Sequence, residues 1–154
     1  MSFTVTVQIS KEIKLDCDFD KAFGIFSDVR KMGSFFPKVE KLEDMGEGAY
    51  KWTMEKMGIA KYGMAVVYAA RYSFDKEAGR ISWSPVPGVG NGQNSGSSKV
   101  RPGGPGKTIV DFSTTLTLDI PYMSLAKPII KPFVESQFVS MMEKFEQNVM
   151  RGVK

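Results

Sequence analysis

The sequence lacks the side chains on which most enzymes and metal sites depend. Its 154 residues include no histidine and one cysteine, Cys17. Histidine is the commonest general base and the commonest metal ligand, and no clustered Asp/Glu spacing suggests a carboxylate-only metal site. We therefore expect no metal, no cofactor and no catalytic residue of these kinds. Cys17 takes an inward position in an alternating segment, so we interpret it as a small core residue rather than a reactive thiol.

Aromatic and methionine residues recur at alternate positions in the middle of the chain, which places them on one face of β-strands. Rigid rings with polar tips and adaptable methionines suit a pocket for an apolar, partly polar ligand. The candidate ligand-binding residues are Tyr50, Trp52, Met54, Tyr62, Met64, Tyr68, Tyr72, Trp83, Phe112, Phe138, Met141, Met142 and Lys11. The alternative for each apolar candidate is that it only fills the core. The tyrosines are the stronger candidates, because a buried hydroxyl needs a hydrogen-bond partner.

Lys11 is the exception in an otherwise apolar row that includes Val7, Ile9 and Ile13. In a regular strand its ammonium points inward and must be paired, reach solvent along its aliphatic stem, or meet an anionic group of a ligand. A β-bulge that turns Lys11 to solvent is the alternative.

Two periodicities define the elements that must position these residues. From Phe3 to Cys17 the apolar residues alternate with polar ones, which predicts one long strand with a buried face. Near the other end an amphipathic helical stripe is formed by Ile130, Val134, Phe138, Met141, Phe145 and Val149. Pro128 fits the first turn of this helix, Pro132 predicts a kink or fresh start, and Gly152 follows its expected end at Arg151.

Short elements and turns fill the interval between the long strand and the long helix. Asp18 or Asp20 can cap a short helix that ends near Asp28, and a second short helix is predicted over residues 29–35. Strands are predicted from Val39 onward, with a hairpin turn at residues 46–48 and one strand over residues 62–74. Further strands are expected at residues 81–83 and 108–120. Residues 93–101 are predicted to form a polar strand, with a mobile flap as the alternative.

This order of elements resembles the helix-grip fold of the START and birch-pollen-allergen superfamily (SRPBCC), which includes polyketide cyclase/dehydrase-like and coenzyme Q-binding-like proteins. The carrying stretches are residues 19–37, 46–52, 80–83 and 131–149, and the match covers essentially the whole chain. The resemblance implies an α+β fold in which a curved antiparallel sheet wraps around a long C-terminal helix, with two short helices after the first strand. It also implies one domain over residues 1–154 and a hydrophobic cavity between sheet and helix.

The leading functional hypothesis is a non-enzymatic carrier or sensor of a small hydrophobic ligand, such as a lipid, quinone, sterol or polyketide-like molecule. A cyclase or aromatase is the first alternative, and without histidine it would use Tyr, Lys, Asp or Glu as acid and base. The second is an interaction module that docks on a membrane, ribosome or partner protein through its basic surface, since the formal charge is +4. No nucleic-acid partner is expected, because Lys and Arg are scattered among acids.

The location of the protein and of the pocket entrance can also be predicted. The start has no basic region followed by an apolar core, and no apolar run approaches ~20 residues, which favours a cytoplasmic location. We expect the entrance near the Gly/Pro-rich residues 87–106 and near residues 32–36, where little buried surface would hold the chain in place. Exposed Phe35 and Phe36, with Lys31 and Lys38, would offer a transient membrane or protein contact there.

Overall fold

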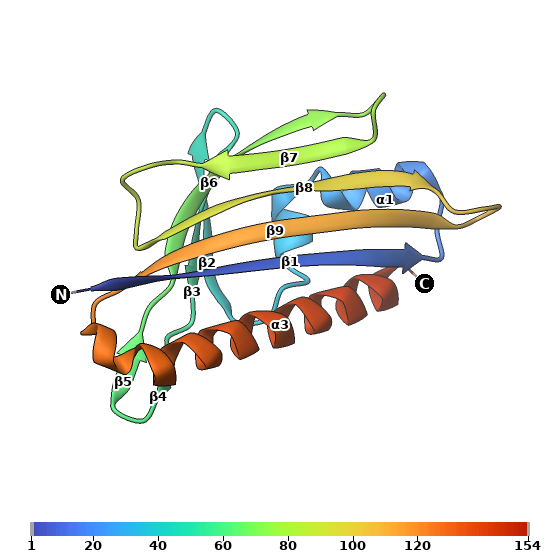
Figure 1. Cartoon of the computed structure of the whole chain (residues 1–154). Helices are drawn as coiled ribbons and strands as arrows, with labels where there is room; N and C mark the ends of the chain where they lie inside the picture. Colours follow the sequence, from blue (N-terminus) through green and yellow to red (C-terminus); the bar gives the residue numbers. More distant parts are fainter. Residues whose placement is uncertain (1, 154) are drawn as a thin grey trace.

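A seven-stranded antiparallel sheet packs against one long helix in the computed structural model, which describes residues 2–153 (Figure 1). The sheet has the order β1-β9-β8-β7-β6-β3-β2. Its strands are β1 (Phe3–Leu15), β2 (Val39–Gly46), β3 (Ala49–Met54), β6 (Val67–Asp75), β7 (Arg80–Pro85), β8 (Gly92–Pro102) and β9 (Thr108–Ile120). The other elements are α1 (Phe19–Phe26), α2 (Val29–Gly33), a separate hairpin of β4 (Met57–Ile59) and β5 (Tyr62–Met64), a 3₁₀ turn η1 (Ser124–Ala126), and α3 (Lys127–Gly152). This is the helix-grip arrangement that the sequence predicts.

Strand β1 pairs with β9 in unbroken antiparallel register, from Phe3 opposite Ile120 to Leu15 opposite Thr108. The strict alternation of the sequence therefore becomes a strict alternation of faces, because successive side chains of a strand point to opposite sides. No bulge occurs at Lys11, so the interpretation that a bulge turns it outward is wrong. Cys17, just beyond the strand, is buried as expected, and burial raises the pKa of its thiol.

The two short helices begin at aspartate caps. The Asp18 carboxylate accepts a hydrogen bond from the backbone N–H of Lys21 (2.9 Å), and Asp28 accepts one from the N–H of Lys31 (3.1 Å). Each bond satisfies an amide that the first helical turn leaves unpaired. Helix α2 ends at Gly33, two residues before the predicted end. A Cβ at Gly33 would lie 2.7 Å from the Leu42 side chain, so glycine lets α2 approach the sheet closely.

Helix α3 crosses the inner face of the sheet and is held on both of its sides. Lys11 of β1 forms an ion pair with Glu146 (3.1 Å), while Asn148 donates to the carbonyl of Phe35 (2.8 Å) and Lys38 donates to Gln137 (3.2 Å). The predicted stripe faces the sheet: Ile130, Val134, Met141, Phe145 and Val149 are buried, and Phe138 is half-buried. Among the described helices, none has the length and apolar character that a membrane span requires.

The prediction of one strand over residues 62–74 is wrong, because the chain leaves the sheet between Met64 and Val67. Asn91, in the loop between β7 and β8, forms hydrogen bonds with the backbone at this break. Its side-chain NH₂ donates to the carbonyl of Ala65 (2.7 Å), and its side-chain oxygen accepts from the N–H of Val67 (2.9 Å). Residues 62–64 pair with β4 instead. The alternation of apolar residues continues through the break, so periodicity alone does not reveal it.

Residues 92–102 form strand β8, which confirms the strand interpretation over the flap. The strand pairs with β9 along its whole length, from Gly92 opposite Leu118 to Pro102 opposite Thr108. Gly90, in the preceding loop, has φ +69°, and a Cβ there would lie 2.1 Å from the carbonyl oxygen of Val67. This part of the Gly-rich segment is therefore fixed against the start of β6.

Candidate functional site

A small cavity lies between the inner face of the sheet and the middle of α3. Its walls come from α2 and the following turn, from strands β3, β6, β7, β8 and β9, and from α3. The lining residues are Met32, Phe36, Trp52, Met54, Tyr68, Tyr72, Trp83, Asn94, Phe112, Thr114, Phe138, Met141 and Met142. Its volume is about 40 Å³. This exceeds the ~10–15 Å³ that one water needs but is well below the ~150 Å³ of a cavity known to hold benzene.

Most of the candidate residues from the sequence meet at this cavity. Those that line it are Trp52, Met54, Tyr68, Tyr72, Trp83, Phe112, Phe138, Met141 and Met142. They come together because alternate positions of the strands face α3, and because Phe138, Met141 and Met142 lie on the side of α3 that faces the sheet. Their contact with a ligand stays a prediction.

Four candidates lie elsewhere. Tyr50 packs edge-on against Tyr72 (ring centroids 6.0 Å apart), outside the ring of lining residues. Tyr62 and Met64 belong to the β4–β5 hairpin, where Tyr62 packs against Tyr122 (4.9 Å) and Met64 pairs with Met57. Lys11 points inward, but its ammonium is paired with Glu146 on α3, and both side chains are about one quarter exposed. Lys11 is therefore a tether of the helix and not part of the cavity wall.

Four residues that line the cavity are not among the candidates from the sequence. Asn94 and Thr114 lie on the inward phase of β8 and β9, a position that the alternation could have identified. Met32 and Phe36 come from α2 and the turn after it. The sequence places these two residues four positions apart but does not show that the segment folds back onto α3.

A chain of aromatic contacts forms the wall. Trp52 stacks on Tyr68 (6.1 Å, 16° between planes), and its indole N–H donates to the hydroxyl of Tyr72 (3.1 Å). Trp83 contacts both Tyr72 (5.7 Å) and Phe112 (5.5 Å). Offset and edge-on aromatic pairs of this kind are rigid, which fixes the sheet side of the cavity. The opposite side, on α3, carries two methionines and the half-buried Phe138, which are easier to move.

The polar groups at the cavity are mainly hydrogen-bond donors. The hydroxyl of Tyr68 forms no hydrogen bond within residues 2–153, and burial raises its pKa, so it keeps its proton at neutral pH. Burial likewise raises the pKa of Tyr72, whose oxygen accepts from Trp52 and leaves its own proton to donate. The indole N–H of Trp83 is buried and has no hydrogen-bond partner within residues 2–153. Asn94 donates to Thr114 (2.8 Å) and to the carbonyl of Thr115 (3.0 Å).

Phe36 separates the cavity from an outer groove. The same side chain lines the cavity and a surface groove formed with Arg30, Gly33, Ser34, Val39, Glu40, Lys41 and Leu42. This arrangement supports an entrance near residues 32–36. The expectation that Phe35 and Phe36 are exposed is wrong, however, because both are half-buried: Phe36 stacks on Phe145 (3.9 Å), and Phe35 lies so close to Gly152 that a Cβ there would be 2.6 Å from its ring. A membrane or protein contact at this place stays a prediction.

Comparison with solved structures supports the fold, whereas comparison with family models and with curated proteins gives no match. Among solved structures, the Zhui aromatase/cyclase from a Streptomyces species is 12% identical with a TM-score of 0.71, over 96% of this chain and 93% of that one. A START superfamily protein from Mycobacterium smegmatis is 12% identical with a TM-score of 0.70, over 95% and 96% of the two chains. Norcoclaurine synthase from Thalictrum flavum is 17% identical with a TM-score of 0.62, over 99% of both.

The protein therefore has the helix-grip fold, and the resemblance recognised in the sequence is confirmed at the level of the fold. The similar structures include proteins described as enzymes and one described only by its superfamily. The function has to be argued from the cavity itself.

Proposed function

We propose that this protein binds a small, mainly apolar ligand with a hydrogen-bond-accepting oxygen in the cavity between the sheet and α3, as a carrier or sensor. The observation that carries the proposal is the unpaired hydroxyl of Tyr68 in a wall of aromatic and methionine side chains. An apolar wall with a few convergent polar groups is typical of ligand pockets. Quinones, sterols, lipids with a carbonyl group and polyketide-like molecules have the required chemistry.

Binding requires the cavity to enlarge. At about 40 Å³ it is too small for a single aromatic ring, so a ligand must displace side chains. Met54, Met141, Met142 and Phe138 are the side chains that yield, because methionine adapts its shape at little cost and Phe138 is half-buried. The stacked pair Trp52–Tyr68 stays in place and serves as the platform for the ligand.

A catalytic role in the manner of a cyclase or aromatase is the second candidate, and the similarity to the Zhui aromatase/cyclase is the observation in its favour. The lining residues weigh against it, because they include no Asp, Glu, Lys, Arg or Cys. General acid–base catalysis works best with a group whose pKa lies near the working pH. The phenols of Tyr68 and Tyr72 have pKa values raised above the ordinary value, which suits them as hydrogen-bond donors and not as bases.

Methionine methyl NMR tests the proposal directly. Acetophenone, a single ring with one ketone oxygen, should shift the methyl signals of Met54, Met141 and Met142 in a saturable way with one site per chain. The exposed Met45 and Met123 serve as internal controls and should not shift. Native mass spectrometry of gently purified protein should show a bound small molecule. Shifts that do not saturate, or that are equal at the control methionines, contradict specific binding in the cavity.

A further inference from the structure

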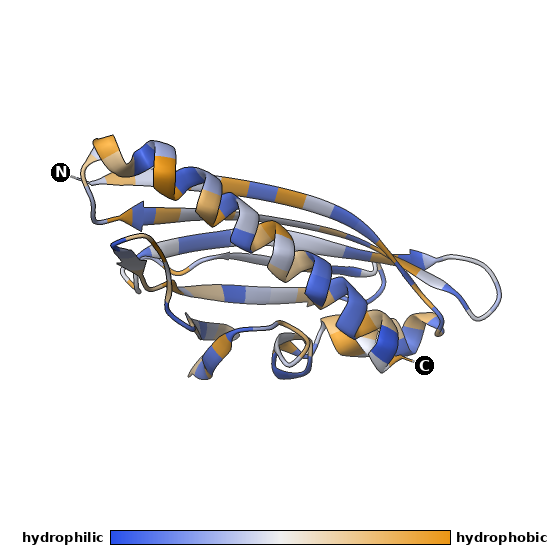
Figure 2. Ribbon diagram, turned by 90° about the horizontal axis from the view of Figure 1, so that it is seen from below, coloured by the Kyte–Doolittle hydropathy of each residue, from blue (hydrophilic) through white to orange (hydrophobic). Residues whose placement is uncertain are grey.

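Exposed apolar side chains gather at the end of the molecule where α3 begins. Leu125 is 84% exposed, Met123 is 60% exposed and Ile129 is 46% exposed. All three lie within seven residues of chain, in η1 and the residues on either side of it. Figure 2 shows the hydrophobic colouring of this turn and of the start of α3. A cluster of large exposed apolar side chains marks an interaction surface more often than single exposed apolar residues do.

The β4–β5 hairpin extends this surface. The ring of Tyr62 packs edge-on against Tyr122 (4.9 Å), and the hydroxyl of Tyr122 donates to the carbonyl of Gly63 (2.5 Å). Figure 1 shows the hairpin beside the beginning of α3. A shallow depression joins the two segments, and its residues together with Ile129 define what we name the tip surface: Lys61, Tyr62, Tyr122, Met123, Leu125, Ala126 and Ile129.

The β4–β5 region and the region around η1 contain basic residues and no acidic ones. No Asp or Glu occurs in residues 56–74 or in residues 120–134, whereas these stretches contain Lys56, Lys61, Arg71, Lys127 and Lys131. Arg71, in the middle of β6, is paired with Glu47 (3.7 Å). Lys131 lies 3.8 Å from Glu135, and within residues 2–153 the other three lysines form no ion pair. Residues 78–110 also lack Asp and Glu, but two of the four cations there are paired with acids from other segments, Arg101 with Asp111 and Lys107 with Asp16. In residues 38–44 lysines alternate with acids.

We propose that the tip surface docks this protein on an anionic lipid surface. The exposed side chains of Leu125 and Met123 suit the boundary between headgroups and acyl chains, the tyrosines suit the interface, and the lysines attract anionic headgroups. A second copy of this chain fits less well, because it would bring the same lysines together without acids to pair them. This docking does not depend on what the cavity binds.

Vesicle co-sedimentation tests the proposal. The protein should bind vesicles of phosphatidylcholine with phosphatidylserine more tightly than vesicles of phosphatidylcholine alone, and salt should weaken the binding. Leu125→Ser should weaken it roughly tenfold or more, because the apolar anchor is lost. Met45→Ser is the matched control, since Met45 is 47% exposed on β2, outside the tip surface. Equal effects of the two substitutions, or no binding to the anionic vesicles, would overturn the proposal.

The lysines have their own matched pair of variants. Lys61→Gln with Lys127→Gln should weaken binding to the anionic vesicles by roughly fivefold for each lysine. Lys41→Gln with Lys144→Gln changes the net charge equally at exposed positions elsewhere and should leave binding nearly unchanged. Equal losses in both double variants would mean that net charge alone attracts the protein, which contradicts docking through the tip surface.

Sedimentation velocity without vesicles separates lipid docking from self-association. The sedimentation coefficients of the wild type and of Leu125→Ser should agree at all concentrations. If the wild type forms a larger species that Leu125→Ser abolishes, the tip surface is an interface between copies and the proposal is overturned. Circular dichroism should show the same fold for both, because an 84% exposed side chain contributes little to the core.

Discussion

Tyr68 combines a fixed ring with a free hydroxyl. Its ring stacks on Trp52, and the hydroxyl forms no hydrogen bond to residues 2–153. We expect Tyr68→Phe to lower the affinity for acetophenone about fivefold, since a hydrogen bond contributes ~1 kcal/mol. Binding of α-methylstyrene, which has the same shape without the ketone oxygen, should not change. NMR titration with both molecules measures the difference. Tyr50→Phe is the control, and an equal loss for both ligands would exclude a hydrogen-bonding role of Tyr68.

Two buried hydroxyls on neighbouring strands should respond to deletion with opposite sign. Ser98 is 0% exposed and its hydroxyl has no hydrogen-bond partner among the described residues, whereas the hydroxyl of Thr108 donates to the carbonyl of Cys17 (2.8 Å). Ser98→Ala should raise the free energy of unfolding by about 1 kcal/mol, because a buried unpaired group is removed. Thr108→Val should lower it by about 1–2 kcal/mol, because the carbonyl loses its donor. Urea denaturation measures both. A loss in both variants would show that Ser98 is paired in solution.

At the scale of single residues, the sequence predicts the face of the sheet to which a side chain points better than it predicts which residues that side chain contacts. The alternation placed Trp52, Tyr68 and Trp83 on the inner face correctly, because strand geometry dictates it. It also placed Lys11 inward, but the partner Glu146 lies 135 positions away on α3, which no local pattern shows. Ion pairs and aromatic stacks between distant segments depend on how the elements pack, and this information is absent from periodicity.

Helix α3 carries two phenylalanines that test where the solid core ends and the cavity begins. Phe145 is fully buried and touches Phe26, Phe36 and Phe112, so Phe145→Ala should cost ~3–5 kcal/mol. Phe138 is half-buried at the cavity, and Phe138→Ala should cost about 1–2 kcal/mol because fewer contacts are lost. The larger effect of Phe138→Ala should be on ligand affinity. Thermal denaturation and NMR titration measure the two quantities, and equal stability losses with unchanged affinity would remove Phe138 from the site.

At the scale of elements, helices and long strands were predictable and the hairpin was not. Capping residues and proline defined α1, α2 and α3 to within a few residues, because their effects are local. The β4–β5 hairpin was absorbed into a longer strand, since the side chain of Asn91 creates the break from 24 to 26 residues away. The position of the tip surface, which depends on that hairpin, could not be predicted for the same reason.

For the whole molecule, the buried phenols predict loss of stability in alkali. Burial raises the folded-state pKa of Tyr68 and Tyr72 above the ordinary value of 10.0. In the unfolded chain both phenols ionise near that value. Their contribution to the free energy of unfolding is therefore fully present below about pH 10 and is lost as the pH rises toward the folded-state pKa. Alkaline unfolding followed by circular dichroism should therefore begin above about pH 10. The double variant Tyr68→Phe with Tyr72→Phe should unfold at higher pH, and an unchanged midpoint would contradict the role of these two groups.

The overall fold was predictable because the order of elements is distinctive, whereas the size of the cavity was not. A curved sheet around one helix leaves interior space that side chains such as Phe36, Met141 and Met142 fill to different extents. The remaining volume of about 40 Å³ results from their packing. Sequence patterns assign these side chains to the interior but do not say how much of it they fill.

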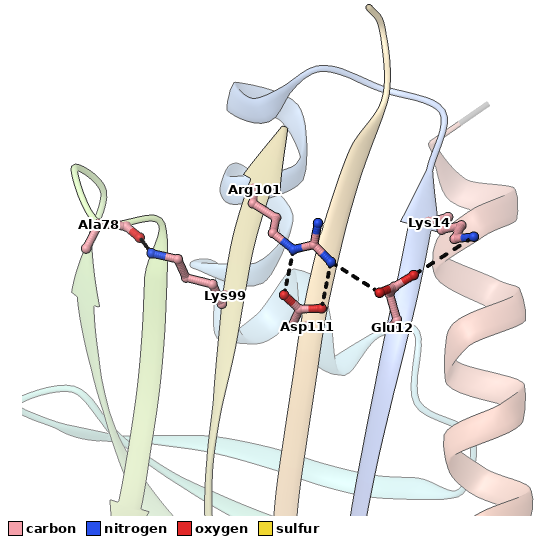
Figure 3. A network of polar contacts seen from close by, with 6 residues as sticks. All are labelled: Glu12, Lys14, Ala78, Lys99, Arg101 and Asp111. Atoms are coloured by element: carbon pink, nitrogen blue, oxygen red, sulfur yellow. Dashed lines mark hydrogen bonds and ion pairs between the residues drawn. The ribbon is translucent and has the colours of Figure 1, made fainter. Parts of the chain in front are cut away.

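On the outer face of the sheet, away from the cavity, charged side chains of neighbouring strands form ion pairs and hydrogen bonds. Arg101 of β8 holds the Asp111 carboxylate with two hydrogen bonds (2.7 and 3.3 Å) and also reaches Glu12 of β1 (3.2 Å), as Figure 3 shows. Figure 3 also shows Lys14 near Glu12 and Lys99 donating to the carbonyl of Ala78. Arg101 lowers the pKa of Asp111 by this hydrogen bonding. Arg101 and Lys14 are therefore paired with acids, whereas Lys61 of the tip surface forms no ion pair within residues 2–153.

The pairing of β1 with β9 has a consequence for synthesis of the chain. Phe3 has its partner at Ile120, so the first strand to leave the ribosome must wait for the last one. At about 5–20 residues per second this delay lasts on the order of ten seconds. Throughout that time β1 has no strand to pair with, and its apolar residues Val5, Val7 and Ile13 have no core to cover them. The nascent N-terminal strand is therefore the segment that a ribosome-associated chaperone would be expected to hold, and folding can be completed only after synthesis has almost ended.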